Sequence, residues 1–148
     1  MNSDESPKEN GSQSYFHYRA TLRISGEIPD LDKISSDLNL RPTRVHRAGE
    51  RLLPRAAPFK HDMWSYRAPV AEDCELDIHI QTLWSHIKAN AEYLRGLKER
   101  CSVDVICGYS SNSAAAGFEV GAASLEMFIA LDVPFGVSVI IGSSTRSV

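Results

Sequence analysis

The chain of 148 residues is 43% hydrophobic and carries a formal net charge of −3. This length and composition suffice for one packed domain, and the acidic balance opposes the broad positive surface of a typical nucleic-acid-binding protein. The polar N-terminus is unlike a secretory signal, and no apolar run approaches the roughly 20 residues of a membrane span, so we expect a cytoplasmic protein.

Both ends of the chain consist mostly of small and polar residues, which contribute little to a core. We therefore expect disordered tails at residues 1–14 and 143–148. The remaining residues, 15–142, are expected to form a single domain.

The first predicted element is a strand at residues 16–25, FHYRATLRIS, in which apolar and polar side chains alternate without a fault. One face of this strand should be buried, and the other should present Arg19 and Arg23 among polar side chains. A short helix is predicted at residues 31–39, after Asp30, which can cap its start.

A basic stretch follows, residues 41–64, with the sequence RPTRVHRAGERLLPRAAPFKHDMW. It holds six Arg and Lys side chains but only two acidic ones. Its prolines and glycine forbid one long helix, so a connecting loop is the expected structure. A second strand is predicted where the stretch ends, at MWSYRA, residues 63–68.

The longest predicted element is an amphipathic helix from about Leu76 to Arg100. Acidic residues precede it and basic residues end it, as the helix dipole favours. We expect its apolar stripe to bury Trp84 and its neighbours against a sheet. The stripe consists of Leu76, Ile80, Leu83, Trp84, Ile87, Ala91, Leu94 and Leu97.

In the last third of the chain the spacing of apolar residues changes twice, from that of a strand to that of a helix and back. Residues 103–109 alternate as a strand, and a Ser/Ala-rich turn leads to GFEV at residues 117–120, a candidate short returning strand. A short helix is predicted around residues 125–129, and a final strand at residues 135–141.

Each predicted strand offers one apolar face and each helix one apolar stripe. The sequence therefore predicts an α+β fold, ferredoxin-like, in which helices cover mainly one face of a mixed or antiparallel sheet of about four or five strands. The three cysteines, Cys74, Cys101 and Cys107, lack the paired close spacing of zinc ligands, which indicates free thiols.

Several segments between Tyr15 and Ile141 together form a recognisable pattern. They are LRISGEIPDLDKISSDLNLRPT, the Gly49-Glu50 step, the strand with Trp64, DIHIQTLWSHI, and GFEVGAASLEMFIALDV with the strand after it. In these segments the chain resembles the bacterial family known as domain of unknown function 4279. The resemblance implies an α+β fold, and it brings neither a catalytic signature nor an assigned activity.

The basic stretch supplies the candidate partner-binding site. Arginine carries a fixed fork of donors that suits carboxylate and phosphate, so such a loop could dock on an acidic partner. The alternative is a solvated loop whose cations neutralise neighbouring acidic residues. The candidate partner-binding residues are Arg41, Arg44, Arg47, Arg51, Arg55 and Lys60.

An alternative polar site contains histidines and aspartates. His79 and His86 lie seven residues apart on the predicted long helix, about 10 Å along its axis, which suits the rim of the core better than one shared metal. We therefore assign no metal and no catalytic residue, and the standard hydrolase, P-loop, dinucleotide and zinc-protease motifs are missing. The alternative site consists of His61, Asp62, Asp77, His79 and His86.

The expected function is that of a small cytoplasmic binding module without a cofactor. Its partner is expected to be another protein, bound through the basic loop or a sheet edge, and a homodimer through a sheet edge is a further arrangement. An immunity-type role belongs to this class by analogy with other small bacterial proteins. The alternative is a small-molecule or metal-dependent enzyme, which a deep cleft lined by histidines and carboxylates would favour.

Overall fold

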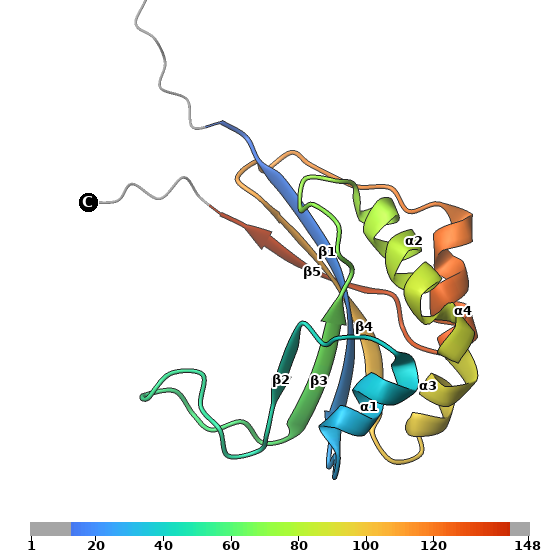
Figure 1. Ribbon diagram of the computed structural model, residues 1–148. Coiled ribbons are helices and arrows are strands. Elements are labelled where there is room, and N and C mark those ends of the chain that lie inside the picture. The colour runs from blue at the N-terminus through green and yellow to red at the C-terminus, as the bar shows by residue number, and fades with distance from the viewer. Residues whose placement is uncertain (1–12, 143–148) are drawn as a thin grey trace, which may run out of the picture.

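The computed structural model describes residues 13–142, so the tails expected at both ends lie almost entirely outside the described residues. It consists of a five-stranded sheet with a layer of helices on one face (Figure 1). The predicted α+β class is thus confirmed, with helices mainly on one side of a mixed sheet.

The strands lie in the order β2-β3-β1-β4-β5, so the first strand is at the centre. Neighbouring strands pair in antiparallel fashion except β4 and β5, which are parallel. The elements are β1 (Phe16–Gly26), α1 (Leu31–Leu38), β2 (Arg44–His46), β3 (Asp62–Arg67), α2 (Leu76–Ile87), η1 (Lys88–Asn90), α3 (Ala91–Leu97), β4 (Ser102–Ser111), η2 (Ala122–Leu125), α4 (Glu126–Leu131) and β5 (Gly136–Ile141).

The core lies between the helix layer and one face of the sheet. Leu22 and Ile24 of β1 are fully buried, as the alternating pattern predicts, and α2 buries Leu83 and Ile87 against the sheet. Trp84 is only 7% exposed, which confirms its predicted burial. The polar side chains of β1 therefore lie on the opposite face of the sheet, away from the helices.

The predicted long helix is wrong in its continuity, because the structure breaks it into α2 and α3. Residues Lys88–Asn90 form a 3₁₀ turn between the two helices. Asn90, a weak helix former, takes a non-helical backbone with φ −108° and ψ 20° at the start of α3. The apolar stripe runs on across the break, so its spacing alone gives no sign of it.

Two further expectations differ from the structure. Residues 117–120, GFEV, form no strand, because the edge of β4 where they would pair is occupied by β5. The basic stretch contains the short strand β2, which pairs with β3. β2 has a single apolar residue, Val45, which is 46% exposed, so its sequence lacks the alternation of a half-buried strand.

Candidate partner-binding surface

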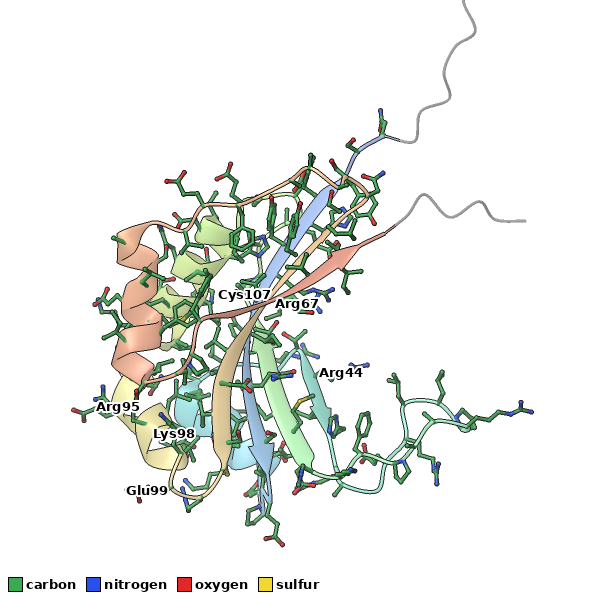
Figure 2. All side chains as sticks on the ribbon, turned by 180° about the vertical axis from the view of Figure 1, so that it is seen from behind. Arg44, Arg67, Arg95, Lys98, Glu99 and Cys107 are labelled. Atoms are coloured by element: carbon green, nitrogen blue, oxygen red, sulfur yellow. The ribbon has the colours of Figure 1, made fainter. Side chains whose placement is uncertain are left out.

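The face of the sheet opposite the helices carries a group of arginines. Strand alternation places Arg19 and Arg23 of β1 on this face, and the cross-strand pairing brings Arg44 of β2 and Arg67 of β3 beside them. We call these four residues the arginine face. Figure 2 shows Arg44 and Arg67 on the side of the sheet away from the helices.

The arginine face is hollowed. A concavity of about 510 Å³ lies over it and is open to solvent. The strand pairing and the twist of the sheet bring side chains from distant parts of the sequence to its wall. Its polar lining includes Arg19, Thr21, Arg23, Thr43, Arg44, Ser65 and Arg67.

One of the four arginines is neutralised internally. Arg23 Nε donates to Asp104 Oδ1 at 2.8 Å, and its Nη2 donates to Oδ2 at 2.9 Å, which makes a two-pronged pair. The hydrogen bond to Asp104 raises the pKa of Arg23 above its ordinary value. The other three, Arg19, Arg44 and Arg67, form no ion pair within the part of the chain that the structure describes.

The chain between β2 and β3, residues 47–61, forms a loop that projects from the sheet away from the helix layer (Figure 1). We call it the projecting loop. Its base is ordered: Gly49 N donates to Phe59 O at 2.8 Å, and Phe59 stacks on His46 with ring centroids 3.6 Å apart. Farther out, Leu52 and Leu53 are 57% and 64% exposed.

Asp62 anchors this loop at the start of β3. Its carboxylate accepts from Ala48 N at 2.9 Å and from Ile28 N at 3.0 Å, and Arg47 Nη1 lies 3.4 Å away. The backbone N–H groups of Ala48 and Ile28 hold the pKa of Asp62 below its ordinary value, and Arg47 adds to the effect. Arg47 also donates to Ile28 O, so both Arg47 and Asp62 are engaged within the fold.

The six candidate cations of the basic stretch do not act as one group in the structure. Arg44 belongs to the arginine face and Arg47 to the base of the loop, whereas Arg41 is exposed ahead of β2. The remaining three, Arg51, Arg55 and Lys60, are exposed on the projecting loop.

Sequence reasoning did not include Arg19, Arg23 and Arg67 in the candidate site, because they lie outside the basic stretch. A signal was present, however, in the alternation of β1 and β3, which places these arginines on the faces opposite the apolar ones. What was missing was the strand order, which decides that β1, β2 and β3 are neighbours.

The alternative polar residues are dispersed. His61 is exposed beside the loop base, and His86 Nδ1 lies 2.7 Å from Tyr66 Oη on the helix side. Asp77 of α2 binds the start of η2, accepting from Ser124 Oγ at 2.6 Å and from Gly121 N at 2.8 Å. These hydrogen bonds, that of Ser124 foremost, hold the pKa of Asp77 below its ordinary value.

His79 lies deeper than the rim position that its place on the helix predicts. It is 1% exposed, and its Nε2 lies 3.1 Å from Cys74 O. Burial lowers the pKa of His79, which favours the neutral ring. Within residues 13–142, no three side chains of His, Cys, Asp or Glu are grouped so that they could hold a metal ion.

The cysteines are free, as predicted. Burial raises the pKa of the Cys107 thiol to about 12, so it is protonated near neutral pH and is a poor nucleophile. No helix in the described part of the chain is both long and apolar enough to cross a membrane.

Comparison with known proteins identifies the chain at the level of a family. The family described as Domain of unknown function (DUF4279) matches residues 16–141, nearly the whole chain, so the chain belongs to this family. No curated protein and no solved structure matches it.

Proposed function

We propose that this member of the DUF4279 family is a small cytoplasmic module that binds another protein through the projecting loop and the arginine face. The observation that carries the proposal is the pair Leu52 and Leu53, which stands exposed on a loop with an ordered base. Exposed apolar side chains flanked by arginines are typical of protein interfaces, and binding residues are often held on loops by a rigid scaffold.

Nucleic acid has less support as a partner. The chain is acidic overall, and single-stranded nucleic acids are held by stacking on exposed aromatic rings. The central strands instead direct Tyr18 and Trp64 into the core, where Trp64 Nε1 donates to Ser35 Oγ at 2.9 Å. The enzyme alternative has less support as well, because its histidines and aspartates are dispersed among separate structural contacts.

The outer edge of β5 supports the proposal of a homodimer. This strand, Gly136–Ile141, has no charged residue and no proline, the usual protection against edge-to-edge pairing. Val139, Ile140 and Ile141 are each at least half exposed. Sedimentation of the full chain and of Ile140→Lys would test this arrangement, because a charge at the edge should shift a dimer to monomer.

An immunity-type role is one form that this binding function could take. A module that blocks another protein needs a rigid scaffold and a charged, partly apolar contact surface, and both are present here. This role rests on analogy with small bacterial proteins that block toxins.

Capture of partners by the immobilised full chain tests the proposal. Replacing Leu52 and Leu53 together by Ser should abolish capture while the melting temperature stays unchanged, because both side chains are largely in solvent. Ile129 on α4 is 79% exposed and provides the matched control, Ile129→Ser, which should retain capture. Equal loss in both variants, or no loss in the double variant, would contradict the proposal.

A further inference from the structure

Three of the four arginines on the arginine face form a diagonal row across neighbouring strands. Arg44 of β2 pairs with Ser65 of β3, two residues before Arg67. Arg67 in turn pairs with Thr21 of β1, two residues after Arg19. Diagonal neighbours in a sheet have Cα atoms about 7–8 Å apart, within reach of side chains as long as arginine.

This arrangement is unfavourable unless an anion joins it. Like charges on neighbouring strands repel, and Arg44, Arg67 and Arg19 have no carboxylate partner within the described residues. Arg67, at the centre of the row, has its Nε buried without a hydrogen-bond partner. A buried donor without an acceptor destabilises a protein, so Arg67, which lines the hollow, gains a hydrogen bond if its side chain turns the guanidinium group toward an acceptor bound there.

The backbone beneath the row makes room for it. Gly108 of β4 is opposite Arg19, and a Cβ atom at position 108 would lie 2.8 Å from Arg19 Cγ and from Arg19 Nε. The arginine therefore lies flat over the glycine. Because a glycine inside a strand loses packing, its presence here is explained by the close approach of the Arg19 side chain.

A hydroxyl group adds a donor to the hollow. Thr43 Oγ1 accepts from the backbone N–H of Arg67 at 2.9 Å, which leaves the proton of its hydroxyl free to donate. Thr43 and Thr21 both line the hollow of about 510 Å³ that the arginines surround. Guanidinium forks and hydroxyl donors around one concavity are the groups that bind oxyanions in proteins.

We propose that the hollow of the arginine face is a binding site for an oxyanion, with Arg67 at its centre and Arg44 and Arg19 on either side. Three unneutralised guanidinium groups favour a doubly charged group, either one phosphate monoester or two neighbouring carboxylates. This inference deepens the proposed function and rests on it in one respect: the oxyanion would be a group on the partner protein. Arg23 is paired with Asp104, so it lines the hollow without offering a free charge to the anion.

Calorimetric titration of the full chain with inorganic phosphate, at constant ionic strength, tests the site itself. We expect saturable binding that weakens about tenfold or more in Arg67→Met, because hydrogen bonds to charged groups are among the stronger ones. Arg55→Met on the projecting loop removes the same charge and should leave phosphate affinity unchanged. Equal affinity of Arg67→Met and the native chain would overturn the proposal, as would absence of phosphate binding.

The variant Gly108→Ala distinguishes a site of defined geometry from a general attraction of the anion to positive charge. It keeps every charge, yet its added methyl group displaces Arg19, so we expect phosphate affinity to fall at least several-fold while the melting temperature shows that the chain remains folded. Unchanged affinity in a folded Gly108→Ala protein would show that only net charge attracts the anion, and it would contradict the proposed geometry.

Two peptides identify the source of the oxyanion. A phosphoserine peptide and the same peptide with two glutamates are titrated against the full chain. The peptide that binds more tightly shows whether the site prefers a phosphate monoester or a pair of carboxylates. Either should lose affinity in Arg67→Met, and if neither does, the site is not the one proposed. Phosphate binding without partner capture would refute only the proposed function, whereas capture without phosphate binding would refute only the oxyanion site.

Discussion

The projecting loop and the arginine face are two collections of cations that differ in how they are assembled. Arg51, Arg55 and Lys60 are neighbours in the sequence, and their side chains are exposed. They belong to the loop between β2 and β3, which projects from the sheet in Figure 1. The arginine face is drawn from β1, β2 and β3, which are far apart in the sequence and adjacent in the sheet. The density of cationic residues along the sequence therefore does not indicate where positive charge is concentrated in the structure.

The surroundings of the two groups differ as well. The loop cations are exposed, so their interactions with a partner are weak and screened by salt. Arg19 and Arg44 of the face are exposed as well, but together with half-buried Arg67 they lie on a rigid sheet around one hollow, where several guanidinium groups act on the same anion. We therefore expect charge changes on the face to weaken partner capture more than charge changes on the loop, and changes in the core beneath the face to have the largest effect on stability.

The largest expected effect comes from the core that supports the face. Trp84→Ala should lower the free energy of unfolding by about 3–5 kcal/mol, the usual loss for a buried large aromatic side chain. Urea denaturation measures it. A change within about 0.5 kcal/mol, typical of surface positions, would show that the helix layer does not support the sheet as described.

Charge reversal compares the two groups directly. Changing Arg19, Arg44 and Arg67 to Glu should weaken partner capture by about a hundredfold or more, because several charged hydrogen bonds are lost together. The matched change of Arg51, Arg55 and Lys60 to Glu should weaken it less than about tenfold, since exposed pairs contribute little. If the loop reversal has the larger effect, the comparison between the groups is wrong.

Arg67→Met should slightly stabilise the isolated chain. The substitution keeps the apolar stem and removes both the like-charge repulsion and the unpaired Nε donor, so we expect a gain of about 0.2–1 kcal/mol at low salt. At about 1 M salt, where charges are screened within about 3 Å, the gain should shrink. A loss of stability at low salt would indicate that Arg67 has an internal partner.

Asp62 gives a smaller, pH-dependent effect at the base of the loop. Its pKa is lowered in the folded state, so its contribution to stability is complete above the unfolded value of about 3.9 and is lost as the pH falls through the folded pKa. The difference in melting temperature between the native chain and Asp62→Asn should therefore be present at pH 7 and vanish at strongly acidic pH. A difference that is independent of pH would exclude the carboxylate as its cause.

The sequence was sufficient for the elements of the core and insufficient for the site. Alternation at residues 16–25 and the apolar stripe with Trp84 depend on local spacing, which a sequence states directly. The pairing of β5 with β4 depends on tertiary contacts, which local spacing does not carry, and the break at Asn90 leaves the spacing of the apolar stripe intact, so that spacing does not reveal it. The site belongs to this second class, since Arg67 meets Arg19 and Arg44 only through strand order.

The most direct test is an NMR titration of the full chain with phosphate, in which the Nε–Hε signals of the arginine side chains are followed individually. The account predicts that the signals of Arg67, Arg19 and Arg44 shift together and saturate, because all three side chains line the hollow in which the proposed anion would bind. Those of Arg51 and Arg55, on the projecting loop, should stay in place. Shifts confined to the loop, or spread evenly over all the arginines, would contradict the claim that strand order assembles the anion-binding surface.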